Sequence, residues 1–132
     1  METHTATLDR TRILVVEDSA PIRQRLVKLL EEIGGVEVVG QAEEAEEAAA
    51  DILRLRPDAV ILDILLAEGS GLDVLRAVHS RAPEIVFIVL TNFANPQYRR
   101  ICMEAGASHF FDKSIEMHKV RELVSSLAPA HH

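Results

Sequence analysis

The sequence predicts an α/β domain with a doubly wound, parallel β-sheet, and three observations predict it. Strand-like and helix-like segments alternate from one end of the chain to the other. The segments 59–63 and 84–90 are nearly continuous apolar runs, which is typical of strands buried on both faces of a parallel sheet. Glycine or proline separates several of the segments. Five strands that alternate with five helices through right-handed crossovers give this fold class.

The first strand is expected at 12–17, where a β-branched run ends in acid, and the first helix at 19–32. Apolar residues of this helix recur at helical spacing. Ser19 suits the N-cap, and Pro21 lies in the first turn, where proline costs little. Gly34–Gly35 then ends the helix.

The second strand is expected at 36–40 and the second helix at 43–56, before Pro57. Four glutamates are expected in the first turns of this helix, where the helix dipole favours negative charge. They are Glu43, Glu44, Glu46 and Glu47. We therefore interpret the acidic cluster as structural. The third strand covers 59–63, and the third helix covers 70–81.

The fourth strand is expected at 84–90 and the fourth helix at 95–105. The inner face of that helix is expected to consist of Tyr98, Ile101, Cys102 and Ala105. A short fifth strand follows at 108–111. Ser114 is expected to cap a last helix that continues to about residue 127.

The composition describes one globular domain. Of 132 residues, 48% are apolar and 27% charged, which is enough apolar material for one core. The net charge is −7 and no basic stripe with interleaved aromatics occurs, which argues against direct nucleic-acid binding. The single cysteine excludes a disulfide framework, and no apolar run approaches the ~20 residues of a membrane helix. We expect a flexible arm at 1–10, the domain at 11–128, a tail at 129–132 and a cytoplasmic location.

The residues at the carboxyl ends of the predicted strands form a chemically distinct set. They are Glu17 and Asp18 after the first strand, Asp63 after the third, Thr91 after the fourth and Lys113 after the fifth. Doubly wound folds place their sites at this edge of the sheet, so we expect these side chains to converge.

Three carboxylates at one site need positive charge beside them. Two unit charges ~4 Å apart repel by about 4 kcal/mol at an effective dielectric constant of ~20. Lys113 supplies part of the compensation. Mg²⁺ fits the remainder, because it binds through one or two carboxylates and keeps waters that a phosphate can replace. The arrangement predicts a site prepared for a phosphoryl group.

These residues lie in sequence motifs that resemble the receiver domain of two-component response regulators. The motifs are VVEDSAPIR, DILLAEGSGLDVL, LTN and GASHFFDKS, in that order, and the resemblance covers about residues 12–127. The resemblance implies a flavodoxin-like (βα)5 fold with strand order 2-1-3-4-5. The chain is similar to the stand-alone, chemotaxis-regulator-like type.

The resemblance also implies roles for single residues. Asp63 is the expected phosphoacceptor. Glu17 and Asp18 are expected to hold Mg²⁺, together with Asp63 and the backbone carbonyl of Leu65.

Thr91 and Lys113 are expected to bind the phosphoryl oxygens. Phe110 corresponds to the aromatic residue whose side chain moves inward when the threonine moves. Such a domain is a phospho-accepting switch and not a turnover enzyme.

The implied phosphodonor is a histidine kinase or a histidine phosphotransfer protein. We expect the output partner to be a protein that docks on the fourth helix, fifth strand and fifth helix, where Arg99, Arg100 and Met103 should face outward. We allow for a homodimer, and expect neither nucleic acid nor membrane as a direct partner.

Two other functions compete with this prediction. A pseudo-receiver would be a constitutive interaction domain, but the intact strand-end set argues against it. An enzyme on a similar scaffold would need other residues. A haloacid-dehalogenase-type phosphatase would have a second Asp where Leu65 stands, and a flavodoxin would have a Ser/Thr/Gly-rich loop after the first strand.

Three residues depart from the family pattern, namely Ala67, Asn92 and Ser114. The family usually has a proline, joined by a cis peptide, where Ser114 follows Lys113. A cis bond without proline costs ~2.5–4 kcal/mol. We therefore expect strain or a rearrangement here: either a cis Lys113–Ser114 peptide held by the surrounding site, which we favour, or a trans peptide from which Lys113 reaches in by another route.

Overall fold

The structure is a computed structural model that describes residues 10–128. The expected arm, apart from Arg10, and the tail at 129–132 lie outside the described residues. Within the described part, no helix has the length and apolar content that crossing a membrane requires.

Five parallel strands form one sheet in the order β2-β1-β3-β4-β5, as the resemblance implies. The strands are β1 (Thr11–Val16), β2 (Val36–Ala42), β3 (Ala59–Leu62), β4 (Val86–Thr91) and β5 (His109–Asp112). The helices are α2 (Ala20–Glu31), α3 (Ala45–Leu55), α4 (Gly71–Val78), α5 (Pro96–Glu104) and α6 (Met117–Leu127). A 3-10 turn, η1 (His79–Arg81), follows α4.

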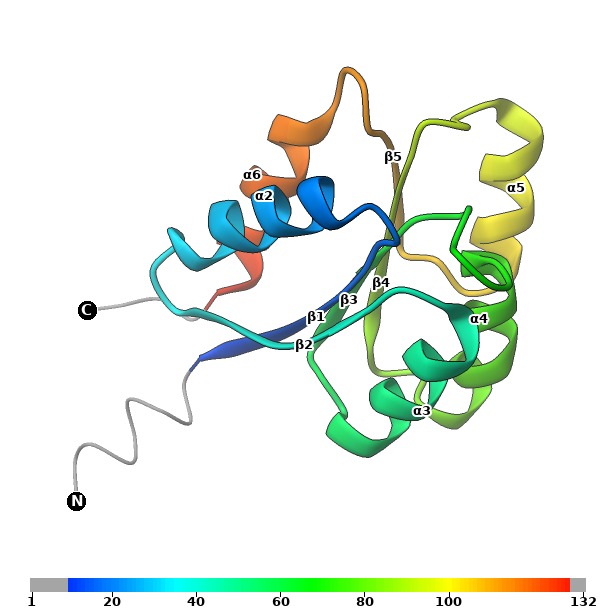
Figure 1. The fold of residues 1–132 in the computed structure, drawn as a ribbon, viewed down its shortest axis with the longest axis horizontal. Coiled ribbons are helices and arrows are strands. Elements are labelled where there is room, and N and C mark those ends of the chain that lie inside the picture. Colours follow the sequence, from blue (N-terminus) through cyan, green and yellow to red (C-terminus); the bar gives the residue numbers. More distant parts are fainter. Residues whose placement is uncertain (1–9, 129–132) are drawn as a thin grey trace.

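Helices cover both faces of the sheet, with α2 and α6 on one face and α3, α4 and α5 on the other (Figure 1). Successive strand residues point to opposite faces. Ile61 therefore packs in the cluster that contains Leu30 of α2, whereas Leu62 packs in the cluster that contains Ile52 of α3. The central strands are apolar on both sides because both sides are buried, which explains the continuous apolar runs in the sequence.

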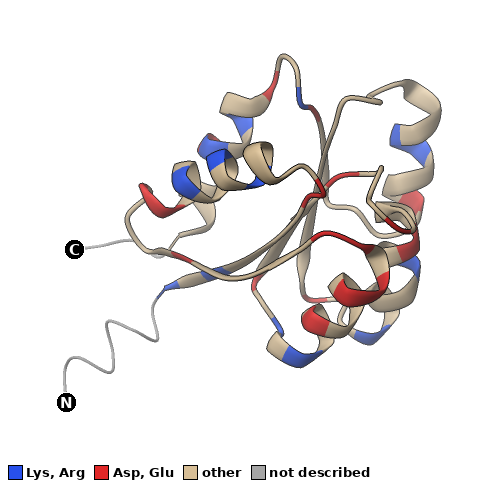
Figure 2. Ribbon diagram, in the orientation of Figure 1, with Lys and Arg blue, Asp and Glu red and all other residues tan. Residues whose placement is uncertain are grey.

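Acidic residues gather in the first half of α3, whereas Lys and Arg occur on helices of both layers (Figure 2). Only Glu46 and Glu47 lie in the first turn of α3, because Glu43 and Glu44 precede the helix. The prediction that all four glutamates lie in the first turns is therefore half correct.

Two other local expectations are wrong. Tyr98 lies in the first turn of α5 and is 41% exposed, because only the second half of this helix packs on the sheet, through Cys102. Ser114 does not cap the last helix. That helix begins at Met117, and Ser114 instead hydrogen-bonds to Asp112.

Gly71 fixes how closely α4 approaches the end of β3. Its N–H donates to the carbonyl of Ile64 at 2.8 Å, and an added Cβ would overlap the backbone carbonyl oxygen of Asp63. No other residue type fits at this position without a shift of the chain that carries Asp63.

We expect Gly71→Ala to lower the free energy of unfolding by roughly 1–3 kcal/mol, the usual cost of overpacking. Gly34→Ala is the matched control, because an added Cβ there meets no atom within 4 Å. Urea titrations of both variants test the prediction. Equal stabilities for the two variants would contradict it.

Candidate functional site

Parallel register brings the strand-end residues together. Val16 pairs with Leu62, so the next residues, Glu17 and Asp63, lie side by side at the edge of the sheet. The N–H of Asp63 donates to the carbonyl of Val16 at 3.1 Å, which extends the pairing by one step. Lys113 enters from the other side, where its N–H donates to the carbonyl of Thr91 at 2.8 Å.

The Lys113 ammonium group bridges the two buried carboxylates. Its Nζ lies 2.7 Å from Glu17 Oε1 and 2.7 Å from Asp63 Oδ2. All three side chains are at most 10% exposed. Each carboxylate has a second partner, because Ser19 N–H donates to Glu17 Oε2 and Ile64 N–H donates to Asp63 Oδ1. The structure thus joins residues that lie 96 and 50 positions apart in the chain.

The pKa values of Glu17 and Lys113 are both raised, but for different reasons. Burial raises the pKa of Glu17 above its ordinary value, and the hydrogen bond from Lys113 offsets only part of this effect. Burial by itself would lower the pKa of Lys113, but the hydrogen bonds to Asp63 and Glu17 outweigh it, and that pKa is raised. The raised pKa of Glu17 is therefore chiefly a consequence of burial, whereas that of Lys113 comes from its two carboxylate partners.

Asp18, by contrast, does not join the bridge. It follows Glu17 directly but is exposed at the mouth of the site. Within residues 10–128, no three His, Cys, Asp or Glu side chains are arranged to hold a metal ion among themselves.

The donor set nevertheless suits a hard cation. Two buried carboxylates beside one ammonium leave one net negative charge, and Asp18 adds a second. Mg²⁺ binds through one or two carboxylates and retains several waters, so it needs no complete protein cage.

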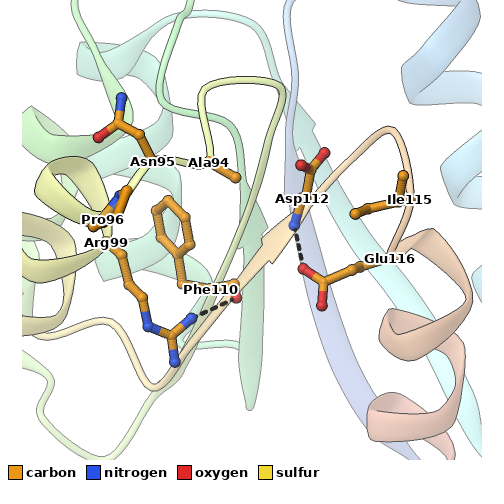
Figure 3. A pocket seen from close by; sticks show the side chains of 8 residues that line it. All are labelled: Ala94, Asn95, Pro96, Arg99, Phe110, Asp112, Ile115 and Glu116. Atoms are coloured by element: carbon orange, nitrogen blue, oxygen red, sulfur yellow. Dashed lines mark hydrogen bonds between the residues drawn. The ribbon is translucent and has the colours of Figure 1, made fainter.

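Thr91 and Phe110, the residues predicted to act as a switch pair, are both buried. Thr91 is fully buried, and its Oγ1 accepts a hydrogen bond from Phe93 N–H at 3.1 Å. Phe110 is buried in the cluster that faces α3, α4 and α5. Its ring lines a pocket of about 330 Å³ between the start of α5 and the loop from β5 to α6 (Figure 3).

The expectation of a cis peptide after Lys113 is wrong. The described residues contain no cis peptide bond, and Lys113 reaches Asp63 from a trans backbone. The side chain of Asp112 accepts hydrogen bonds from both the N–H and the hydroxyl of Ser114, and so stabilises the trans turn.

Arg23 of α2, which contacts the backbone of Glu17, was not among the predicted site residues. Its guanidinium group donates to the carbonyl of Glu17 at 2.8 Å and pairs with Glu43 at 3.3 Å, and its side chain is 13% exposed. An arginine four residues into a helix gives no pattern of its own. Only its place on the first turns after the acidic strand end could have drawn attention to it.

We expect Glu17→Gln to change the pH dependence of stability in metal-free buffer. Since the pKa of Glu17 is raised when folded, the folded protein binds this proton more tightly than the unfolded chain. Stability from this group therefore falls as the pH rises from about 4.5, its ordinary pKa, through the raised pKa. The glutamine variant lacks this loss, so its free energy of unfolding should increase relative to wild type over that window.

The raised pKa of Lys113 does not interfere, because its contribution is lost only above an ordinary value of 10.5. Glu84→Gln serves as control, since Glu84 forms an exposed pair with Arg56. Urea unfolding at several pH values gives the comparison. A difference between Glu17→Gln and wild type that stays constant with pH would contradict the expectation.

Comparison with known proteins supports the family that the motifs indicate. Residues 13–125 match the model of the response regulator receiver domain. The chain is similar to the DNA-binding transcriptional activator DevR/DosR of Mycobacterium tuberculosis, with 32% identity over 80% of this chain and 48% of that protein. The chain thus spans about half or less of the curated relatives it matches.

Solved structures agree with this fold. The receiver domain of the putative response regulator NarL from Mycobacterium tuberculosis superposes with a TM-score of 0.83 at 25% identity, covering 91% of this chain and 97% of that one. A CheX–CheY–BeF3–Mg²⁺ complex from Borrelia burgdorferi superposes with a TM-score of 0.80 at 24% identity, covering 88% and 87% of the two chains.

The family match, the strand order and the strand-end residues agree. The match is to a signalling domain, as the resemblance implied, and the family binds Mg²⁺. The chain belongs to the response regulator receiver domains of two-component systems, which a histidine kinase phosphorylates on an aspartate.

Proposed function

We propose that Asp63 is the phosphoacceptor of this receiver domain. The observation that supports this most strongly is the position of the Lys113 ammonium group, which lies 2.7 Å from Asp63 Oδ2 at the carboxyl ends of the strands. A fixed positive charge beside a carboxylate can neutralise the phosphoryl group that the carboxylate receives. Asp18 is exposed and does not contact Lys113, and the Glu17 side chain is more deeply buried than that of Asp63, 4% against 10% exposed.

In the proposed reaction, a carboxylate oxygen of Asp63 attacks phosphorus in line, and the bond from phosphorus to the donor imidazole nitrogen breaks. Lys113 remains beside Asp63 and donates a hydrogen bond to one phosphoryl oxygen, while the buried hydroxyl of Thr91 donates to another phosphoryl oxygen. The hydroxyl proton of Thr91 is available for this, because Phe93 N–H uses Oγ1 as an acceptor.

Mg²⁺, when bound, supplies positive charge to the transferred group. The residues proposed to hold it are Glu17, Asp18 and Asp63, with the backbone carbonyl of Leu65, a residue that is 52% exposed. Mg²⁺ would share the Glu17 carboxylate with Lys113, whose Nζ lies 2.7 Å from Oε1.

We expect Asp63→Asn to abolish phosphorylation by acetyl phosphate and Mg²⁺, since an amide oxygen is a much weaker nucleophile than a carboxylate. The fold should persist, because the amide oxygen still accepts one of the two hydrogen bonds that Asp63 accepts from Lys113 and Ile64, and the variant has one buried negative charge fewer. Intact-mass measurement follows the phosphoryl group. Asp58→Asn is the control, at the opposite end of β3, where it accepts a hydrogen bond from Arg12 N–H. A phosphorylated Asp63→Asn variant would disprove the assignment.

The proposed donor is a histidine kinase or a histidine phosphotransfer protein, which places the domain in the cytoplasm, with no direct contact to nucleic acid or membrane.

The proposed output face consists of α5, β5 and α6. Exposed apolar side chains gather around it, with Tyr98 at 41%, Met103 at 37% and Ile115 at 70%. Arg99 and Arg100 of α5 are also exposed, as expected from the sequence. Exposed methionine, tyrosine and arginine are typical of protein interfaces.

Addition of beryllofluoride and Mg²⁺, which imitate the phosphorylated state, should change amide hydrogen exchange mainly in α5, β5 and α6. The physical reason is that β4, which ends at Thr91, pairs with β5, which carries the buried Phe110, and that Arg99 of α5 donates to the Phe110 carbonyl at 3.3 Å. Exchange in Asp63→Asn gives the baseline. Changes confined to α2 and α3 would place the output elsewhere, and a rise in mass by light scattering would indicate a homodimer.

A further inference from the structure

The backbone of Lys113 is held on both sides, and by different means. On the N-terminal side, the N–H of Lys113 donates to the carbonyl of Thr91, which is the last hydrogen bond along the pairing of β4 with β5. On the C-terminal side, the chain turns away from the sheet, and Asp112 Oδ1 accepts the N–H of the next residue, Ser114, at 2.9 Å. The Ser114 hydroxyl donates to the same oxygen at 2.6 Å.

A second carboxylate closes this turn from the helix side. Glu116 Oε1 accepts the N–H of Asp112 at 2.8 Å, and the Asp112 carbonyl accepts the N–H of Glu116 at 2.7 Å (Figure 3). Glu116 is held in turn by Lys119, whose Nζ lies 2.9 Å from Oε2. Asp112 and Glu116 therefore bind each other's backbone across the turn that contains Lys113 and Ser114.

Both carboxylates are ionised in this arrangement. Hydrogen bonds from Ser114 lower the pKa of Asp112, and the hydrogen bond from Asp112 N–H lowers the pKa of Glu116. Neither side chain contacts Glu17 or Asp63. Their contacts are with the turn that precedes α6, so any effect on the site passes through the backbone of Lys113.

We propose that Asp112 and Glu116 are positioning residues that hold the turn around Lys113 and so aim its ammonium group at Asp63 and Glu17. The proposal rests on the function proposed above, in which Lys113 contacts the phosphoryl group. In this chain, a hydrogen-bonded turn at Ser114 takes the place of the proline that the resemblance led us to expect. A long side chain with four rotatable bonds reaches one position reliably only if its backbone origin is fixed, and small displacements of a catalytic group are costly.

The test observes Lys113 directly, in the resting protein without donor or metal. The three lysines of the chain are labelled with ¹⁵N at Nζ, and the signal of Lys113 is assigned by its loss in Lys113→Gln. In wild type, the buried double ion pair should protect the Lys113 ammonium protons from exchange with water. In Asp112→Ala, we expect this exchange to become about tenfold faster or more, since the turn loses both Ser114 hydrogen bonds.

Two variants separate positioning from general stability. Asp112→Asn retains an oxygen acceptor and should restore most of the protection. Asp58→Ala removes a carboxylate that accepts a backbone N–H at 2.8 Å at the other end of the sheet, so it should leave Lys113 unchanged. The proposal would be overturned if the Lys113 ammonium protons of Asp112→Ala exchanged as slowly as those of wild type. It would also be overturned if Asp58→Ala lost as much protection as Asp112→Ala.

A milder pair of variants decides the question if Asp112→Ala does not fold. Ser114→Ala removes only the 2.6 Å hydroxyl bond to Asp112, and Ser126→Ala removes a 2.6 Å hydroxyl bond to the Leu123 carbonyl in α6. Of the two variants, only Ser114→Ala should show faster exchange of the Lys113 ammonium protons than wild type. Equal exchange rates in the two variants would contradict the proposal.

Beryllofluoride binding with Mg²⁺ is measured on the same samples. Asp112→Ala should bind about tenfold more weakly than wild type, and Asp112→Asn close to wild type. A wild-type protein that binds no beryllofluoride would contradict the proposed function, whereas the ammonium exchange would still decide the positioning role.

Discussion

The site depends on one interaction, the Lys113 ammonium group between two buried carboxylates. Without the lysine, Glu17 and Asp63 would face each other as like charges away from water, which costs several kcal/mol. With it, the pair is tolerated but not neutral, because one positive charge stands against two negative ones. Burial raises the pKa of Glu17, and the hydrogen bond from Lys113 offsets this only in part. The site can therefore accept further positive charge from a cation. That charge can in turn stabilise the negative charge of a phosphoryl group.

The fold supplies this arrangement through register and not through local sequence. Glu17, Asp63 and Lys113 each follow a different strand, and only the parallel order β2-β1-β3-β4-β5 brings the three strand ends to one edge. Both faces of the sheet are covered by helices, so the edge is the place where polar groups can gather without breaking the apolar core. The uninterrupted apolar strands and the acidic strand ends are therefore two consequences of the same architecture.

The sequence predicted the elements and the strand-end residues because those features depend on short-range patterns. Apolar runs ending in acid identify β1 and β3, and the order of the motifs identifies the family. It did not predict the turn after Lys113, because the peptide isomer there depends on whether a neighbouring side chain can hold the trans form. Asp112 does so, and nothing in the residue pattern distinguishes that aspartate from a solvated one.

The exposure of Tyr98 could not be predicted for a different reason. Helical spacing places it on the same side as Cys102, but spacing does not say how far along the helix the sheet extends. The separation of Asp18 from the bridge likewise depends on tertiary contacts. Two adjacent acids at a strand end cannot be told apart in the sequence, but in the structure Lys113 contacts Glu17 while Asp18 is exposed.

A crystal structure of the protein with Mg²⁺ and beryllofluoride would show which carboxylate binds the phosphoryl mimic and where Lys113 then lies. We expect beryllium on a carboxylate oxygen of Asp63 and the Lys113 Nζ within hydrogen-bonding distance of a fluorine. Beryllofluoride bound to another carboxylate, or bound to Asp63 with Lys113 turned away from it, would show that Lys113 does not prepare Asp63 for the phosphoryl group.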